Sequence, residues 1–250
     1  MKRILRFSTL IFVIFLLITV SCAKKTRLLQ TDKGMMIKDY TFFHNAGITF
    51  DGEHYITTSG GNSYYSRINM YNLSGNLVKS IDAGIDGRSI HYLMNQKRLL
   101  VKKYGNYLMD IDEANESGEN NYDIYFIESN SSIAFDPNED YVYEMTNYGD
   151  IIVTDIISGD LVNEITIAKY YDEILYNTSI AVGQKYLYIW GGKDKIYMYD
   201  KKGTLNDSID IQFNAYPLSL SYCNGMLWIA QDADAESNGG YGYYYGFDVE

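Results

Sequence analysis

The sequence predicts an all-β fold made of repeated units, and three observations support this prediction. Beyond the first 34 residues, apolar and polar positions alternate in short stretches separated by turn residues, as in half-buried strands. Tyrosine, which favours strands, occurs 26 times in 250 residues, whereas proline occurs only twice. Five segments of similar pattern begin at residues 47, 89, 132, 179 and 219. We therefore expect one repeat domain over residues 35–250.

Each repeat contains the same order of predicted strands. An apolar strand such as SIAF (132–135) is followed by a polar turn and by a second strand such as YVYEM (141–145). A third strand, a turn and a fourth strand complete the unit. The predicted fourth strands are LVKSIDA, YDIYFIE, LVNEITIA and LNDSIDIQ. Steps of 40–47 residues with four strands each are typical of the blades of a β-propeller, so we predict five blades.

The third repeat, SIAFDPNEDYVYEMTNYGDIIVTDIISGDLVNEITI, resembles the YVTN-type and NHL-type propeller repeats of exported bacterial proteins. The similarity lies in the S-I-A strand, the Asp136–Pro137 turn, the V-Y strand, and a strand that ends on Asp155 before a glycine turn. It extends over residues 35–250 and is weakest in the second and fifth repeats. The resemblance implies a fold and leaves the function open.

The last repeat ends after its third strand, at YGFDVE (245–250). The segment MMIKDYTFF (35–43) precedes the first repeat and resembles the predicted fourth strands. Closing a propeller with its N-terminal segment removes the open sheet edges. We therefore predict that residues 35–43 supply the outer strand of the fifth blade. The alternative is a sixth, degenerate blade within residues 112–131.

The first residues form a predicted export signal. Lys2, Arg3 and Arg6 precede an apolar run from Leu10 to Val20, which has the length of a signal segment and is short for a membrane span. Cys22 follows in TVSC, which resembles a bacterial lipobox, except that Thr19 replaces the usual Leu, Val or Ile.

The lipobox resemblance implies a signal peptide over residues 1–21, lipidation of Cys22 with fatty acids such as palmitate, and a tether to residue 34. The protein would then be anchored to a bacterial membrane on its extracytoplasmic side. The alternatives are an ordinary secretory signal and an uncleaved anchor. With Cys22 lipidated, the only other cysteine, Cys223, has no partner, and we expect it to be a small buried side chain on a strand.

The charge of the chain argues against nucleic acid as a partner. The formal net charge is −11, whereas a DNA or RNA binder needs a basic face that displaces counterions. We interpret the acidity as a contribution to solubility.

In a propeller, the loops between strands four and one and between strands two and three share one face, where ligands usually bind. Here these loops are rich in Tyr, Asn, Gly and Asp, which suit the stacking and hydrogen bonding of sugars and also occur in protein-binding loops. We expect a monomeric ring that binds a protein or a glycan. The alternative is a set of solvated loop residues that bind nothing. The candidate residues are Tyr64, Tyr65, Arg88, Tyr148, Tyr170, Tyr171 and Trp190.

Calcium is the one cofactor for which the sequence offers a pattern. Asp232, Asp234 and Glu236 alternate as in an EF-type loop, but Ser237 stands at the glycine position and Tyr243 at the position of the closing glutamate. We favour a solvated acidic loop, and therefore no metal site.

A catalytic alternative remains. The protein could be a propeller hydrolase or lyase, lactonase-like, with a metal in the central channel. That function requires His44, His91 and three or more acids to converge on one end of the channel. The sequence has no zinc-binding motif, so we favour a binding or scaffolding protein over an enzyme.

Overall fold

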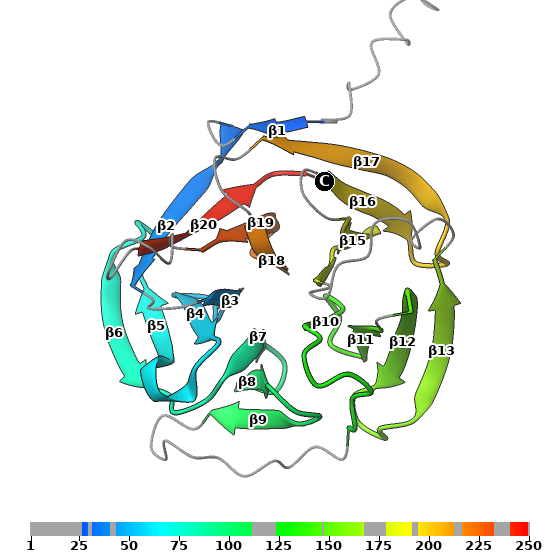
Figure 1. The fold of residues 1–250 in the computed structure, drawn as a ribbon, viewed down its shortest axis with the longest axis horizontal. Helices are drawn as coiled ribbons and strands as arrows, with labels where there is room; N and C mark the ends of the chain where they lie inside the picture. The colour runs from blue at the N-terminus through cyan, green and yellow to red at the C-terminus, as the bar shows by residue number, and fades with distance from the viewer. Residues whose placement is uncertain are drawn as a thin grey trace, which may run out of the picture.

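Five small sheets surround a central channel in the computed structural model, which describes residues 27–29, 32–40, 44–111, 124–146, 148–167, 179–191, 195–212, 217–232 and 241–249 (Figure 1). Each sheet is one blade, and its first strand lies nearest the centre. The predicted five-bladed β-propeller is confirmed.

The blades follow one another around the ring in chain order. Blade 1 contains β3 (His44–Phe50), β4 (Tyr55–Gly60), β5 (Arg67–Tyr71) and β6 (Leu77–Asp82). Blade 2 contains β7 (Gly87–Leu93), β8 (Arg98–Lys103) and β9 (Leu108–Ile111). Blade 3 contains β10 (Ile133–Phe135), β11 (Tyr141–Met145), β12 (Asp150–Asp155) and β13 (Leu161–Thr166). Blade 4 contains β14 (Ile180–Val182), β15 (Tyr186–Trp190), β16 (Lys195–Asp200), β17 (Leu205–Gln212) and the short β1 (Arg27–Leu29). Blade 5 contains β18 (Pro217–Cys223), β19 (Met226–Gln231), β20 (Tyr241–Phe247) and β2 (Met35–Tyr40).

The hydrophobic core is divided among the five seams between neighbouring blades. Strand alternation puts one set of apolar side chains on each face of a blade, and every seam joins two such faces. The seam between blades 3 and 4, for example, contains the fully buried Met145, Ile151 and Ile189. Each such side chain contributes roughly 1.5–3 kcal/mol on burial. The ring is therefore held by five separate cores.

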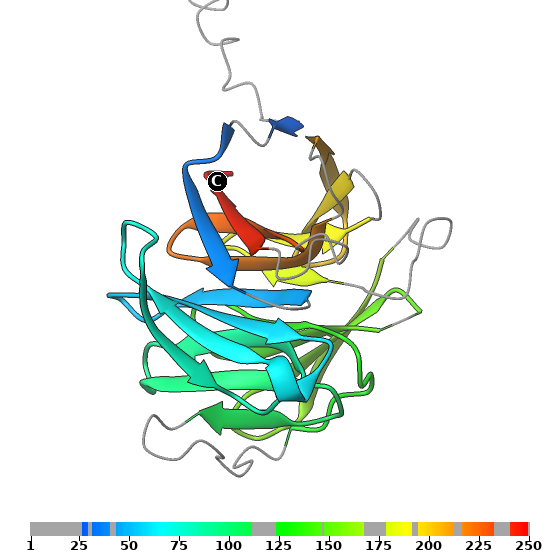
Figure 2. The ribbon, with the colours of Figure 1, turned by 60° about the vertical axis from the view of Figure 1, so that its left-hand side comes forward.

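The N-terminal strand closes the ring as predicted. β2 pairs antiparallel with β20, from Met35 opposite Gly246 to Tyr40 opposite Tyr241, and lies on the outside of blade 5 (Figure 2). Ile37 of β2 is fully buried in the seam between blades 5 and 1. Residues 41–43 of the predicted closing segment lie outside the described residues.

A buried polar cluster also ties the closing strand to blade 1. The Asp39 carboxylate of β2 accepts hydrogen bonds from the Tyr71 hydroxyl and, at 2.6 Å, from Asn69 Nδ2, both on β5. Burial raises the pKa of Asp39, while these hydrogen bonds oppose that rise. Nearby, the Tyr244 hydroxyl donates to the carbonyl of Thr58 at 3.2 Å. Blade 5 is thus joined to blade 1 by polar as well as apolar contacts.

Three residues within the predicted tether form a strand. β1 pairs in parallel with the outer edge of β17, with Arg27 opposite Asp210 and Leu29 opposite Gln212. The side chain of Leu28 is fully buried in the core between blades 4 and 5. An apolar residue in a polar segment therefore attaches the chain to the ring before the closing strand begins.

Blade 2 departs from the prediction because the expected fourth strand, YDIYFIE (122–128), does not form over residues 124–128. Ile124 and Phe126 are instead buried in the seam between blades 2 and 3. The alternative of a sixth blade gains no strand from residues 124–131, and residues 112–123 lie outside the described part.

The predicted signal peptide, residues 1–21, and Cys22 also lie outside the described residues. In the part of the chain that the structure describes, no helix has the length and apolar character needed to cross a membrane.

Candidate functional site

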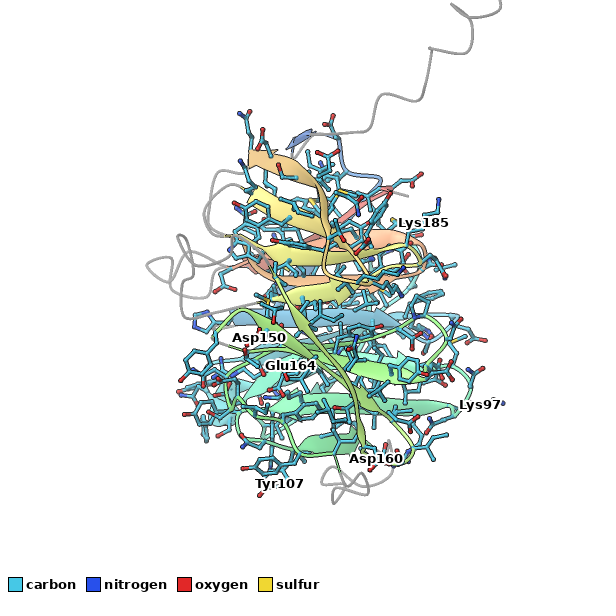
Figure 3. All side chains as sticks on the ribbon, turned by 90° about the vertical axis from the view of Figure 1, so that its right-hand side faces the viewer. Lys97, Tyr107, Asp150, Asp160, Glu164 and Lys185 are labelled. Atoms are coloured by element: carbon cyan, nitrogen blue, oxygen red, sulfur yellow. The ribbon has the colours of Figure 1, made fainter. Side chains whose placement is uncertain are left out.

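The central channel ends in two cavities of different chemistry, one at each face of the ring. Every blade contributes to both, through the two ends of its first strand and the adjoining loops. Tyr107 and Asp150, beside the loops between strands two and three, lie on one side in Figure 3. Lys97 and Lys185, on turns between strands one and two, lie on the other side.

The cavity on the loop side, here called the polar mouth, measures about 230 Å3. It is lined by His44, Asn45, Ala46, Gly61, Gly87, Arg88, Asn130, Ser132, Ser179 and Ser219. The cavity on the turn side, here called the aromatic mouth, measures about 360 Å3, and its lining includes Phe50, His91, Tyr92, Phe135 and Tyr222.

Buried serines form the wall of the polar mouth. Ser179 Oγ accepts a hydrogen bond from the N–H of Leu220 at 2.8 Å and lies 3.2 Å from Ser132 Oγ. Ser219 Oγ donates to the carbonyl of Asn45 at 3.1 Å. Each of these bonds joins one blade to the next, so the hydroxyls link neighbouring first strands around the channel. The serines at or beside the start of the first strands are Ser89, Ser132, Ser179 and Ser219.

Blade 1 carries glycine where the other blades carry this serine. A Cβ on Gly47 would lie 3.0 Å from the nitrogen of Ile90 and 3.2 Å from Ser89 Cα, because β3 and β7 approach closely. Thr49, two residues further along β3, supplies a hydroxyl at this seam by accepting from the N–H of Tyr92 in blade 2 at 2.9 Å. The repeated serine of the sequence therefore bonds across the other four seams.

Arg88, a predicted site residue, lines the polar mouth and is paired within the protein. Its guanidinium lies 3.0 Å from Asp86 Oδ2, and its Cζ lies 5.2 Å from the centre of the Tyr104 ring. The other carboxylate oxygen of Asp86 accepts from the N–H of Gly61 at 2.5 Å. A carboxylate, a cation and an aromatic ring thus form a fixed cluster between blades 1 and 2.

A second ion pair lies where blades 5 and 1 meet. His44 Nδ1 bonds to Asp232 Oδ2, and Asp232 Oδ1 accepts from the N–H of Asn45 at 2.8 Å. The hydrogen bond to Asp232 raises the pKa of His44 above its ordinary value, although partial burial opposes the rise. The protonated form of His44 is therefore favoured. Its charge is balanced by Asp232, as the charge of Arg88 is balanced by Asp86.

Three of the predicted tyrosines are exposed on the loops of this face. Tyr64 and Tyr65 form the short 3-10 turn Ser63–Tyr65, and their rings make an edge-to-face contact at 4.8 Å. Tyr64 is 83% exposed, and Tyr148, beside blade 3, is 71% exposed. Tyr104 is exposed on the corresponding loop of blade 2. None of these four lines the cavity itself, but they lie on loops of the same face, and Tyr104 contacts Arg88 of the cavity lining.

The remaining candidate site residues either do not line the polar mouth or lie outside the described part of the chain. Trp190 is half-buried and packs against the core between blades 4 and 5. Tyr170, Tyr171, Asp234 and Glu236 lie outside the described residues. Asp232, the first acid of the proposed calcium loop, is the partner of His44.

The catalytic alternative required histidines and acids to gather at one end of the channel. His44 lines the polar mouth, whereas His91 lines the aromatic mouth. Within the described ranges, no group of three or more His, Cys, Asp or Glu side chains is placed to hold a metal ion.

Apolar and aromatic side chains form most of the aromatic mouth, and its charged lining residues are Asp136 and Glu139. Burial lowers the pKa of His91 to about 3, so its imidazole is neutral, and its ring contacts Phe135 at 4.8 Å. Cys223 also lines this cavity as a half-buried free thiol, and burial raises its pKa. These side chains extend the apolar cores of the blades to the channel.

Comparison with known proteins identifies the fold as a β-propeller. No family model and no curated protein matches the chain. Among solved structures, glutaminyl cyclase from Myxococcus xanthus is similar over 85% of this chain and 94% of its own, with a TM-score of 0.61 and 10% identity. The tail fiber of Staphylococcus aureus phage P68 is similar over 87% of this chain and 52% of its own, with a TM-score of 0.56 and 15% identity. At these identities the likeness shows the fold alone.

Sequence reasoning missed most of the polar mouth. It named Arg88, but it predicted neither the pairing of Arg88 with Asp86 nor that of His44 with Asp232. The repeated serine was visible as the first letter of the SIHY, SIAF, SIAV and SLSY segments, and its spacing could have indicated a ring of hydroxyls.

Proposed function

We propose that this protein is a membrane-anchored binding protein whose polar mouth recognises a neutral, hydroxyl-rich ligand, and we identify that class as glycan. The observation that carries the proposal is that the cations lining the mouth, Arg88 and His44, are each paired with a carboxylate of the protein. Because these cations are paired, the polar mouth has little net charge with which to attract an ion. It offers fixed hydroxyl, amide and guanidinium groups, which suit the donors and acceptors of a sugar.

The exposed tyrosines support the same ligand class. Aromatic rings provide an apolar face on which the C–H side of a sugar ring can stack, while their hydroxyls remain in water. Tyr64, Tyr65, Tyr104 and Tyr148 lie on loops of the same face as the mouth, on three neighbouring blades. A glycan chain longer than the 230 Å3 cavity would extend across these rings.

Membrane attachment through Cys22 is part of the proposal and rests on the lipobox resemblance. Since β1 begins at Arg27, four residues separate it from Cys22, and an extended chain spans roughly 3.3–3.6 Å per residue. The attachment would therefore keep the outer edge of blade 4 within roughly 18 Å of the lipidated cysteine. Lys24 and Lys25 in this stretch would favour an anionic membrane surface.

The binding function is tested by a thermal-shift screen of the soluble protein from residue 23 against neutral and acidic oligosaccharides. A ligand present at about 100 times its dissociation constant adds roughly 2.7 kcal/mol of stability, which shifts the melting temperature measurably. We expect neutral oligosaccharides to stabilise the protein, with little effect of salt. Stabilisation by acidic sugars alone, abolished by salt, would contradict the proposal.

The anchor is tested separately by fractionation of cells that express the full chain. Cys22→Ala should release the protein from the membrane fraction, whereas the matched variant Cys223→Ala should remain there. A Cys22→Ala protein that stays in the membrane would exclude the lipid anchor without affecting the glycan proposal.

A further inference from the structure

Blade 2 is the one described blade with only three strands. β9 (Leu108–Ile111) is its outermost strand and pairs with β8, and its outer edge pairs with no strand of the described residues (Figure 1). The N–H and C=O groups along such an edge are a template for another strand.

Two buried charged residues explain why the chain after β9 is held elsewhere. Lys102 Nζ, fully buried, donates to the carbonyls of Gly105, Glu128 and Ser129 at 3.0, 3.0 and 3.2 Å. Glu144 of blade 3 accepts from the N–H groups of Ile127 and Glu128, both at 2.8 Å. These bonds fix residues 127–129 between blades 2 and 3. The N–H of Phe126 bonds to the carbonyl of Asn106 just before β9, at 3.4 Å, but residues 124–131 form no strand on β9.

The other blades show that outer edges of this ring accept strands from distant parts of a chain. Blade 5 takes β2 as its fourth strand, although more than 190 residues separate β2 from β20. Blade 4 takes β1 in addition to its own four strands. Edge pairing by a segment that is not contiguous with the blade is therefore a repeated feature of this molecule.

The β9 edge has few of the features that block strand addition. Its one charged residue, Asp110, is held by Arg98 of β8, with Nε to Oδ2 at 2.8 Å, so it does not repel an incoming strand. The edge contains no proline. Exposed apolar side chains flank it: the Tyr107 and Tyr125 rings lie 6.5 Å apart in an edge-to-face arrangement, and Ile127 is 55% exposed.

We propose that the β9 edge is a docking site for an extended segment of a protein partner, which adds to blade 2 as its fourth strand. Main-chain hydrogen bonds to β9 would supply the affinity, as in other cases of strand addition. The existing fourth strands define the chemistry of the segment. In β6, β13 and β17 the first residues are exposed, apolar as well as polar, and isoleucine packs inward near the end: Ile81, Ile165 and Ile209. The partner segment therefore carries an isoleucine or valine at this position, after residues that stay exposed.

The test uses hydrogen exchange on the soluble protein from residue 23, with a synthetic peptide of residues 160–167, DLVNEITI, as the probe. In the free protein, the β9 amides that do not bond to β8 should exchange rapidly, whereas the β12 amides covered by β13 should exchange slowly. The peptide should slow exchange at Leu108–Ile111, and saturation should be reached as its concentration rises. A control peptide with Ile165→Pro should have no effect, because proline removes an N–H and cannot continue the ladder.

Three results would overturn the proposal. Slow exchange of all β9 amides in the free monomer would mean that another part of the chain covers the edge. Concentration-dependent dimerisation that protects the same amides would assign the edge to a second copy. A peptide that protects no β9 amide, or protects only other blades, would show that the edge does not accept a fourth strand. None of these results bears on ligand binding at the polar mouth.

Discussion

The two mouths of the channel are built from the same five strands but differ in the size of the side chains that line them. At the loop side, each first strand has a serine or glycine at or near its start, and neighbouring blades approach closely enough to share hydrogen bonds. At the turn side, the same strands end in large side chains such as Phe50, Phe135 and Tyr222. The difference shows that small residues near the start of each first strand leave room for a polar cavity, whereas large residues near its end continue the core.

Weakening the closure of the ring should cause the largest loss of stability, because both mouths depend on the closed ring. Ile37→Ala removes a fully buried side chain from the closing strand, and such substitutions cost about 2–5 kcal/mol. Urea unfolding should show this loss, whereas Met36→Ala, on the exposed side of the same strand, should change stability by less than about 0.5 kcal/mol. Equal effects of the two substitutions would mean that β2 does not close the ring.

Removing one serine should weaken the polar mouth and leave the aromatic mouth intact. Ser179→Ala deprives the buried N–H of Leu220 of its acceptor and Ser132 of a neighbour, which costs about 1–3 kcal/mol. The measurement is the free energy of unfolding, compared with that of the exposed-site variant Ser74→Ala. If Ser179→Ala is as stable as this control, the serine ring does not join the blades.

Arg88 should matter more for ligand binding than for folding. Arg88→Ala removes the guanidinium from the mouth and leaves Tyr104 without its cation, so we expect affinity for a neutral oligosaccharide to fall at least about tenfold, or 1.4 kcal/mol. Arg88→Lys keeps the positive charge but lacks the planar guanidinium group with its paired N–H donors, so it should restore only part of the affinity. Titration calorimetry gives both values, and full affinity in Arg88→Ala would remove this residue from the site.

The pair of His44 with Asp232 should make the smallest contribution to stability. The raised pKa of His44 determines how that contribution changes with pH. Because the folded pKa of His44 is raised, the stabilising contribution is fully present below the unfolded pKa of about 6.5 and is lost as the pH rises through the folded pKa. His44 is half-exposed, so solvent screening limits the contribution to about 1 kcal/mol or less.

Unfolding measured in urea between about pH 6 and pH 9 should show this decline in the wild type and a flatter profile in His44→Gln. The same substitution at the other mouth, His91→Gln, should change the profile near pH 6 in the opposite sense, because His91 stays neutral in the folded protein while the unfolded imidazole takes up a proton below its pKa of about 6.5. Identical slopes in the wild type and in His44→Gln would contradict the pairing.

Most of the ring could be predicted from the sequence because its strands obey local rules. Alternating apolar positions and regular spacing located the strands of blades 1, 3 and 4, and the missing last strand pointed to β2. The fourth strand predicted for blade 2 was wrong because the local pattern favours a strand at YDIYFIE, while the buried Lys102 and Glu144 bind the backbone of that region across a seam. Such long-range polar contacts leave no periodic signal.

The candidate site could be predicted only in outline. Topology placed Tyr64, Tyr65, Arg88 and Tyr148 on one face, because that depends on strand order. The partners that neutralise the mouth could not be found, since Asp232 lies 188 residues from His44 in the sequence. Which side chains meet across the ring depends on the twist and register of the blades, which residue type alone does not determine.

The central claim is that the polar mouth, and not the aromatic mouth, binds a neutral glycan. The most direct measurement is chemical-shift mapping by NMR of the soluble protein during titration with the trisaccharide of N-acetylglucosamine. We expect saturable shifts at Gly61, Gly87, Arg88, Ser179 and Ser219, with the amides near Phe135 and Tyr222 unmoved. Shifts confined to the aromatic mouth, or none at a trisaccharide concentration of several millimolar, would contradict it.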